Sequence, residues 1–406
     1  MTAAQNHSTQ GATARLFVSF ELGWSKLKIA STCDPLQKPR IQEIRARNLE
    51  ALQAELAKAK KRFGLPEDAT VVSCYEAGRD GFWLHRYLTT LGVKNVVVDP
   101  GSLKVNRRRK RAKTDRIDAR LLLDNLLDHE AGKKHVWSVV HVPTLEQEDR
   151  RQLHRELETL LGERTEHVNR LKSLLATLGL KLDKVDAHFE SWLDKQRVLE
   201  SGAEVPGDYR ERMLREYRRW ELVNRQAQDL EEEQKQRVRT STAPAMTKVR
   251  KLMRLKGIGI KSAWLFGMEF FGWRTFRNRR QVGSLAGLTP TPNQSGETSK
   301  ELGINKAGNS WIRSLIIEIA WGWLHWQPKS KLSCWFKAHF GSGAGRSRKK
   351  GIVALARKLL IALWRWVEFD EKPEGAVEVD WEPKVRPTKA PRGEGATRRT
   401  RRGVKG

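Results

Sequence analysis

Four acidic residues occur at positions from which they could hold divalent metal ions. Glu21 and Glu76 each end an apolar, β-branched segment, and Asp115 and Asp118 lie three residues apart in the segment Lys-Thr-Asp-Arg-Ile-Asp-Ala-Arg. Two divalent ions about 4 Å apart can stabilise the attacking and leaving oxygens of a phosphoryl transfer, and several carboxylates must converge to hold them. A single acidic residue is usually an ordinary surface residue, so it is the combination that indicates magnesium-dependent phosphodiester chemistry.

The segments that carry these acids are predicted to form a mixed sheet with helices. Residues 16–31 predict two strands around a central glycine, with a third strand near 41–45 and another over 70–75. Leucines at helical spacing predict a helix over 49–62. The fold class of this part is therefore α/β.

Two further helices complete this part of the chain. A helix around 80–91 leads to the apolar run 93–98, and a strand, a helix and a strand in succession imply a parallel pair with a crossover helix. The last helix is predicted over 115–127, with Thr114 as its N-cap. Its two aspartates then share one helix face.

The charge of the chain favours a nucleic-acid partner. Lys and Arg number 77 against 48 Asp and Glu, a net charge of +29, which attracts polyanions in a salt-dependent way. A noncatalytic nucleic-acid-binding protein would carry the same charge, so composition alone does not indicate an enzyme. The basic residues expected to contact phosphates are Arg107, Arg108, Arg109, Lys110, Arg111, Lys113, Lys256, Lys261, Arg274, Arg277, Arg279 and Arg280.

Cysteine usage and hydropathy exclude several classes of protein. Cys33, Cys74 and Cys334 are far apart and form no Cys-x-x-Cys pair, which argues against a disulfide framework and against structural zinc. The first residues do not resemble a secretion signal, and the apolar run 315–326 is short and contains Glu318. We therefore expect a cytoplasmic protein.

The middle and the end of the chain are predicted to be helical. Apolar residues at three-and-four spacing over 145–178 and 209–236 predict two long helices, arranged as an antiparallel coiled coil that reverses near 200–208. Further helices follow, interrupted by a predicted loop over 287–309 that is rich in Pro, Thr, Ser and Gly. Ten of the fifteen Trp lie from Trp264 onward, which predicts an aromatic core.

Two shorter features have their own interpretations. The turn Lys256-Gly-Ile-Gly-Ile-Lys lacks the spacing of a nucleotide-binding P-loop. It is either a hairpin whose backbone amides approach a DNA phosphate or a tight helix connection without a ligand. The acidic segment 368–382 and the basic segment 384–406 are predicted to be too polar to pack.

Several motifs resemble those of a known family. They are Val18-Ser-Phe-Glu-Leu-Gly-Trp-Ser-Lys, Tyr75-Glu-Ala-Gly-Arg-Asp-Gly, Val98-Asp-Pro-Gly, Lys113-Thr-Asp-Arg-Ile-Asp-Ala, Gly257-Ile-Gly-Ile, Leu285-Ala-Gly-Leu-Thr-Pro, Gln294-Ser-Gly and Ile304-Asn-Lys-Ala-Gly-Asn-Ser. In these stretches, within about 15–135 and 248–330, the chain resembles the DEDD-type insertion-sequence transposases, also called bridge-RNA-guided recombinases.

The resemblance implies three domains. An RNase H/RuvC-like metal-binding domain would span 15–135, a coiled-coil linker and oligomerisation region 143–240, and a mainly helical transposase domain with a helix-hairpin-helix-like turn 248–370. Composition separately predicts a disordered basic tail over 383–406. Carried over residue by residue, the acids match Glu21, Glu76, Asp115 and Asp118, which would bind Mg²⁺, two ions per site, and the catalytic serine matches Ser295.

Two positions raise specific questions. The family has Asp at its first acid, whereas this chain has Glu21, which is one methylene longer. The longer side chain is either tolerated or weakens the enzyme. No obvious base lies next to Ser295, and a free serine hydroxyl is a weak nucleophile. The resemblance implies that the metals of the other domain activate it in a composite site within a multimer; by residue type alone, Ser295 is an ordinary turn residue.

The expected function is site-specific DNA recombination for a mobile insertion sequence. The resemblance implies that a structured guide RNA pairs with target and donor DNA, and that the chain forms a homo-oligomer, a dimer or a tetramer in the synaptic complex, near the nucleoid of a prokaryotic cell. One alternative is a RuvC-like junction nuclease that uses water and leaves Ser295 idle. Another is a noncatalytic nucleic-acid-binding protein.

Overall fold

The computed structural model describes residues 14–103, 115–295, 298–343 and 345–381. The chain divides into two compact units, residues 1–146 and 147–406. The six predicted basic contacts over 107–113 and the tail 383–406 lie outside the described residues.

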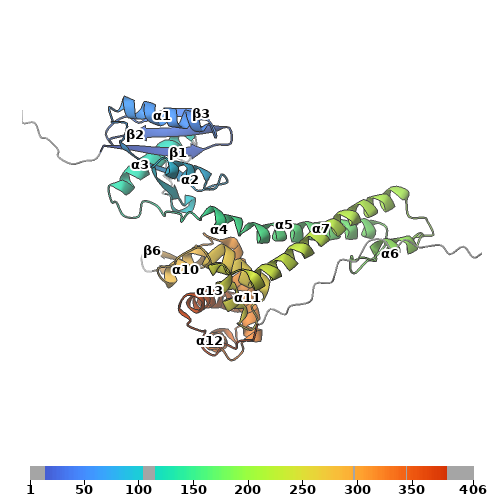
Figure 1. Ribbon diagram of the computed structural model, residues 1–406. Helices are drawn as coiled ribbons and strands as arrows, with labels where there is room; N and C mark the ends of the chain where they lie inside the picture. The colour runs from blue at the N-terminus through green and yellow to red at the C-terminus, as the bar shows by residue number, and fades with distance from the viewer. Residues whose placement is uncertain (1–13, 104–114, 296–297, 344, 382–406) are drawn as a thin grey trace, which may run out of the picture. The chain divides into compact units, whose positions relative to one another are not determined.

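The first unit contains a five-stranded mixed sheet (Figure 1). Its strands are β1 (Arg15–Leu22), β2 (Lys26–Thr32), β3 (Arg40–Arg45), β4 (Thr70–Glu76) and β5 (Lys94–Val98), in the order β3-β2-β1-β4-β5. Antiparallel pairing joins β1 to β2 and β2 to β3, whereas β1 pairs in parallel with β4 and β4 with β5. This mixed α/β arrangement was predicted, and it is compatible with an RNase H-like domain.

Helices cover both faces of the sheet. On one face, α1 (Leu49–Arg62) and α2 (Trp83–Thr90) pack on residues such as Val18 and Phe20. On the other, α3 (Asp115–Glu130) packs on Ala30, Val72 and Cys74. Alternate residues of each strand therefore face different helices. A 3₁₀ turn (Pro100–Ser102) follows β5.

The second unit begins with two long antiparallel helices, α5 (Gln152–Thr177) and α7 (Gly207–Thr240), after the short α4 (Leu145–Asp149). Leu157 near the start of α5 packs with Ala227, and Leu171 near its end clusters with Met213. The reversal also contains α6 (Phe189–Lys195), which is too short for its periodicity to be recognised in the sequence. In the described part of the chain, no helix has the length and apolar composition that crossing a bilayer requires.

The remaining helices pack around an aromatic core. They are α8 (Pro244–Met253), α9 (Ile260–Phe266), a π-helical turn η3 (Gly267–Phe271), α10 (Arg279–Leu285), α11 (Ser310–Trp326), α12 (Lys331–Phe340) and α13 (Arg346–Phe369). Trp264, Phe270 and Trp323 are almost completely buried there, which confirms the aromatic core predicted from tryptophan content.

Two predictions for this part were wrong. The segment predicted as a loop over 287–309 contains a hairpin of β6 (Pro290–Ser295) and β7 (Thr298–Ile304). The acidic segment after α13 packs against the domain, because the Val377 N–H donates to the Gln327 side chain and the Val379 N–H donates to the Arg254 carbonyl. Hydrogen bonds of the backbone offset the low hydrophobicity of both segments, between the two strands in the hairpin and to distant residues in the segment after α13.

Candidate functional site

Glu21 and Glu76 lie side by side at one end of the sheet. In the parallel pairing of β1 with β4, Phe20 aligns with Tyr75, and the two glutamates are the next residues of each strand. Glu76 is exposed and Glu21 is half-buried. The carboxyl ends of two adjacent parallel strands thus deliver two carboxylates to the same edge, as predicted from the strand assignments.

Both glutamates belong to the face of the sheet that α3 covers. The Ser19 hydroxyl donates to the Ala119 carbonyl at 2.6 Å, and the Cys74 thiol lies 3.6 Å from the Leu122 carbonyl. Side chains two residues apart in a strand point to the same face. Glu21 therefore shares the α3 face with Ser19, and Glu76 shares it with Cys74.

The direction of α3 brings its first turn to the same end. Arg15, the first residue of β1, pairs with Glu130, the last residue of α3, at 3.3 Å. Because Ala119 lies over Ser19, further along β1, α3 runs antiparallel to β1. Its N-terminal turn, with half-buried Asp118, therefore lies toward Glu21. Asp115 begins this helix, but its side chain is outside the described set.

The donor chemistry of these residues suits a hard divalent cation. Carboxylate oxygens are the ligands that Mg²⁺ and related ions prefer. Among the described side chains, no three from His, Cys, Asp and Glu stand close enough together to hold a metal ion. The suitability of these residues for a metal ion therefore rests on their position. Glu21, Glu76 and the first turn of α3 lie on the same face and at the same edge of the sheet.

An exposed tryptophan stands beside these acids. Trp24, in the turn after β1, is 68% exposed. The guanidinium carbons of Arg47 and Arg79 lie 5.2 and 5.1 Å from the centre of its ring. Sequence reasoning did not select these three residues, although a lone Trp in the polar turn Gly-Trp-Ser-Lys, three residues after Glu21, was a usable signal.

The predicted nucleophile lies in the second unit. Ser295 ends β6, and its backbone partner in β7 is Thr298. The side chain of Ser295 and residues 296–297 are outside the described set. Glu21 and Glu76 belong to the first unit and Ser295 to the second.

Two glycines close the base of the hairpin that carries Ser295. Gly287 has φ of +67°, and a Cβ there would lie 2.2 Å from the Ala307 carbonyl oxygen. Gly308 has φ of +99°, and its Cβ would lie 2.3 Å from the Leu285 carbonyl oxygen. Only glycine combines this conformation with so close an approach. The motifs Leu-Ala-Gly-Leu-Thr-Pro and Ile-Asn-Lys-Ala-Gly-Asn-Ser therefore form one contact, which we call the glycine clasp.

The predicted basic contacts have different surroundings. Arg277, Arg279 and Arg280 are exposed at the start of α10. Lys256 stands over the Trp326 ring at 5.7 Å, and Lys261 pairs with Glu231 at 2.6 Å.

Arg274 is directed toward the protein interior. Its guanidinium stacks on the Trp273 ring at 4.3 Å. Burial lowers the pKa of Arg274 to about 10, with Glu269 opposing and Arg151 reinforcing the change. Arg274 therefore belongs to a buried ionic cluster.

That cluster joins α5 to the C-terminal helices. Glu269 in η3 is only 2% exposed. Its carboxylate accepts a hydrogen bond from Arg155 Nε at 2.8 Å, and His154 Nε2 lies 2.9 Å from the same oxygen. Burial opposes the ionisation of Glu269, but the bonds to His154 and Arg155 outweigh it and lower its pKa to about 2.

Comparisons with known proteins match this chain to transposases. A sequence model of the transposase IS116/IS110/IS902 family matches residues 249–333, and a transposase model named for the DEDD proteins of IS110 matches residues 31–179. The chain is 40% identical over 385 residues to y4rJ of Sinorhizobium fredii, a protein assigned as a transposase, covering 89% of this chain and 94% of that relative. It is 28% identical over 284 residues to the transposase for insertion sequence element IS1111A of Coxiella burnetii, covering 69% and 73% respectively.

Proposed function

Because the chain belongs to the IS116/IS110/IS902 family of transposases, we propose that it cuts and rejoins DNA for a mobile insertion sequence, with a structured RNA choosing the site. The observation that carries this proposal is the edge of the sheet where Glu21, Glu76 and the first turn of α3 share one face. Acids that share one edge of a sheet, in a chain of net charge +29, suit metal-assisted chemistry on a polyanion.

The acids have a defined role in this proposal. Glu21, Glu76, Asp115 and Asp118 would hold Mg²⁺, which when bound stabilises negative charge on the phosphate. The pairing of β1 with β4 supports the positions of Glu21 and Glu76 in this role. The contact of α3 with β1 supports the position of Asp118. Trp24, flanked by Arg47 and Arg79, would stack on a base next to the cleaved phosphate, because aromatic rings and guanidinium groups bind unpaired bases.

Ser295 would act as the nucleophile. As the serine hydroxyl gives up its proton, its oxygen forms a bond to the DNA phosphorus and the bond from phosphorus to the leaving sugar oxygen breaks. The leaving sugar oxygen takes up a proton, so the step is balanced. The serine–DNA ester keeps the energy of the phosphodiester until a new strand end reverses the reaction, so no ATP is consumed. The glycine clasp supports this role because it fixes the base of the hairpin whose first strand, β6, ends at Ser295.

The acids and Ser295 belong to different units, so we propose that the active site is composite and forms in a homo-oligomer. In this proposal the helices α5 and α7 pack as a coiled coil and contribute to oligomerisation. Guide RNA and two DNA duplexes are all polyanions, which suits the excess of 29 positive charges.

The test is recombination in a purified system. The chain is incubated with RNA transcribed from the flanks of the element, donor DNA, target DNA and Mg²⁺, and recombinant junctions are counted. Asp118→Asn should abolish junctions, whereas Asp128→Asn, at the other end of α3, should leave them unchanged. Ser295→Ala should remove a covalent protein–DNA adduct that the wild-type protein forms.

Two outcomes support other functions. Metal-dependent cleavage that survives Ser295→Ala would assign a nuclease that uses water. The compatibility of the sheet with an RNase H-like domain favours this second candidate, because the acids alone can direct hydrolysis. Binding of DNA and RNA with no cleavage in any metal would indicate a noncatalytic binding protein.

A further inference from the structure

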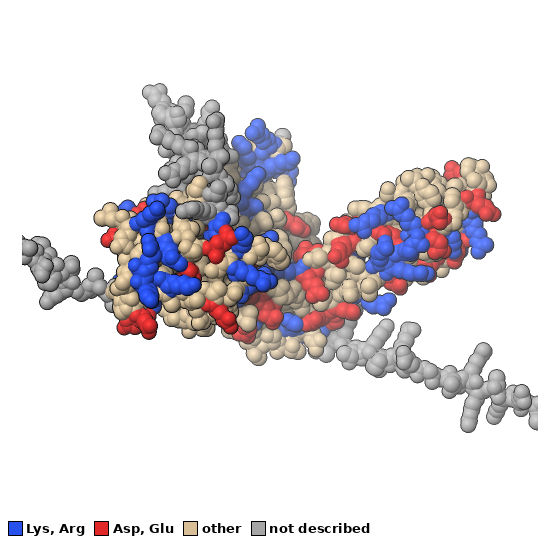
Figure 2. Space-filling model, turned by 90° about the horizontal axis from the view of Figure 1, so that it is seen from above, with Lys and Arg blue, Asp and Glu red and all other residues tan. Residues whose placement is uncertain are grey.

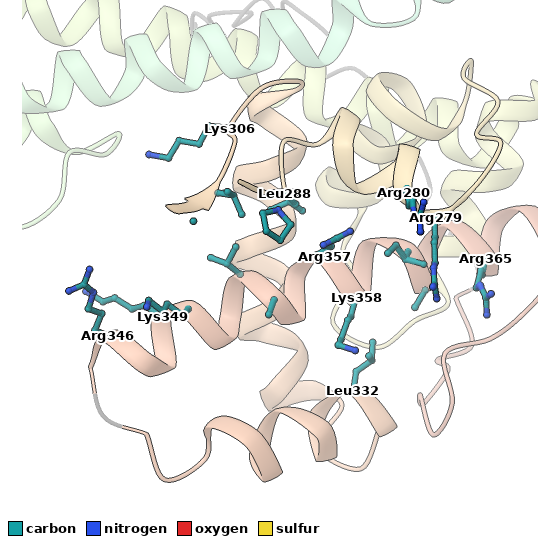
Figure 3. Close-up of a pocket in the computed structure, with 18 residues that line it drawn as sticks. Arg279, Arg280, Leu288, Lys306, Leu332, Arg346, Lys349, Arg357, Lys358 and Arg365 are labelled. Carbon is teal, nitrogen blue, oxygen red and sulfur yellow. The ribbon is translucent and has the colours of Figure 1, made fainter. Parts of the chain in front are cut away.

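The second unit contains a large groove apart from the acidic edge. It has a volume of about 1050 Å³ and lies between α10, α13 and the base of the β6–β7 hairpin (Figure 3). Nine lining residues are basic: Arg279, Arg280, Lys306, Arg346, Lys349, Lys350, Arg357, Lys358 and Arg365. The other nine are apolar or glycine, and none is acidic. We call this surface the basic groove.

Among the residues that the structure describes, most cations of the basic groove have no anionic partner. Arg365 pairs with Glu371 at 3.2 Å, but within the described ranges no carboxylate pairs with any of the other eight. The helices α5 and α7 differ, since Arg170 pairs with Glu166 and Arg237 with Glu233, and acidic and basic side chains mix along them at the right of Figure 2. A concave surface of unpaired cations attracts an anionic ligand.

The shape of the groove favours a linear ligand. Its residues on α13 recur every three or four positions from Arg346 to Arg365, which places them on one face of the helix over about 28 Å. Basic residues alternate along this face with apolar ones such as Val353 and Ile361. A nucleic acid strand offers the matching alternation, since it has a repeating phosphate and an apolar base face.

We propose that the basic groove binds a single-stranded segment of nucleic acid, with phosphates on its cations and bases on its apolar floor. The proposal rests on the function proposed above, and it names a second binding surface for the same substrates. A duplex fits the floor less well, because its bases are stacked inside and its phosphates would meet only the rim. A protein partner would need a continuous acidic surface to match these cations.

The groove is connected to the predicted nucleophile. Pro290 at the start of β6, with Gly303 and Ile304 at the end of β7, lines one side of it. Ser295 is five residues further along β6, or about 17 Å at the rise of a strand. A strand held in the groove is therefore within a few nucleotides of the end of β6, so the groove would feed one strand toward Ser295.

Fluorescence anisotropy of the full-length protein, in EDTA to prevent cleavage, tests this inference. The probes are labelled single-stranded DNA, single-stranded RNA and duplex DNA of about ten nucleotides, titrated at several salt concentrations. The groove variant carries Lys349→Gln, Lys350→Gln and Arg357→Gln, which keep much of each side chain's aliphatic part. The control variant carries Lys58→Gln, Lys61→Gln and Arg62→Gln, which remove the same charge from exposed positions on α1.

The groove variant should bind at least one single-stranded probe about tenfold more weakly or worse. Its slope of log affinity against log salt should fall by about 2, since each lost phosphate contact contributes about 0.7. The control variant should change affinity less than about twofold, and both variants should unfold at the wild-type temperature. The DNA and RNA arms identify which strand occupies the groove.

Three results would overturn the inference: equal single-strand affinity in the two variants, an equal or larger loss for duplex, or a change in oligomeric state without a change in nucleic-acid affinity. Strand exchange is measured separately with Mg²⁺. If the groove binds single strands but the wild-type protein forms no recombinant junctions, the recombinase assignment fails and the groove inference stands.

Discussion

At the scale of single residues, Glu21 is the position where this chain departs from the pattern it resembles. An aspartate there would place its carboxylate one methylene closer to β1. The backbone of Glu21 is fixed by pairing with Lys28 on β2, one position after Phe20 pairs with Tyr75 on β4. The side chain of Glu21 must therefore accommodate its extra methylene by its choice of rotamer, because the strand cannot shift.

We predict that charge matters more than length at this position. Glu21→Asp should retain recombination within about tenfold of wild type, whereas Glu21→Gln should lose about 100-fold or more, because the amide removes an anionic metal ligand. Junction formation in a Mg²⁺ titration measures both. A Glu21→Gln protein with wild-type activity at low Mg²⁺ would remove Glu21 from the metal site.

The sequence predicted that Glu21 and Glu76 end two strands, but it did not select Trp24. Glu21 and Glu76 were accessible to prediction because each follows a strand whose hydrophobic pattern is clear, and parallel neighbours bring their ends together. Trp24 becomes notable only when Arg47 and Arg79, which come from different connections of the sheet, meet its ring. Contacts of that kind depend on tertiary structure and leave no local pattern.

At the scale of secondary-structure elements, the glycine clasp should control the β6–β7 hairpin. Gly287→Ala should destabilise the protein by more than about 1 kcal/mol and reduce recombination, since the new Cβ would meet a backbone oxygen and the residue has positive φ. Gly162→Ala, in open space within α5, should be neutral or stabilising by up to about 1 kcal/mol. Urea unfolding compares the two variants, and equal destabilisation would contradict the clasp.

The buried carboxylate of Glu269 should stabilise the attachment of α5 to η3 in a pH-dependent way. Its folded pKa of about 2 is below the usual 4.5, so its contribution is complete above pH 4.5 and is lost as pH falls toward 2. The difference corresponds to about 3 kcal/mol. Glu269→Gln should therefore lower the unfolding free energy by about 3 kcal/mol at pH 7 and by progressively less below pH 4.5, as measured by urea unfolding at several pH values.

Glu231→Gln provides the matched control for this prediction. Glu231 pairs with Lys261 in a partly exposed salt bridge at the protein surface, and such pairs contribute about 1 kcal/mol or less. A difference between wild type and Glu269→Gln that stays constant from pH 7 to pH 2 would exclude ionisation of Glu269 as the source of the stability.

Local pattern explains which elements were predicted. The helix over 49–62 was predicted with its observed bounds because its leucines repeat at helical spacing. The structure adds that Asn48 caps its N-terminus. The β6–β7 hairpin was missed because Pro290 and Pro292 indicate a loop, whereas its strands are held by pairing with each other. The acidic segment after α13 was missed because Gln327, 50 residues away, supplies its hydrogen bond.

At the scale of the whole molecule, the chain divides its proposed chemistry between two compact units. Glu76 belongs to the first unit and Ser295 to the second. If the active site combines acids and serine from different subunits, mixing Glu76→Gln protein with Ser295→Ala protein should restore activity to about a quarter of the sites. Recombinant junctions from the mixture and from each variant alone measure the recovery.

A second mixture controls for exchange between subunits. Glu76→Gln protein mixed with Asp118→Asn protein should remain inactive, because each metal site would draw all its acids from one chain. Recovery in both mixtures, or in neither, would contradict a site shared between subunits in this way.

The attachment of α3 has a consequence for the connection that precedes it. The helix is held by its own contacts, from Ser19 with Ala119 to Arg15 with Glu130, so the placement of Asp118 does not depend on the number of residues that precede it. A change in the length of the connection before α3 would therefore leave Asp118 in place over the sheet.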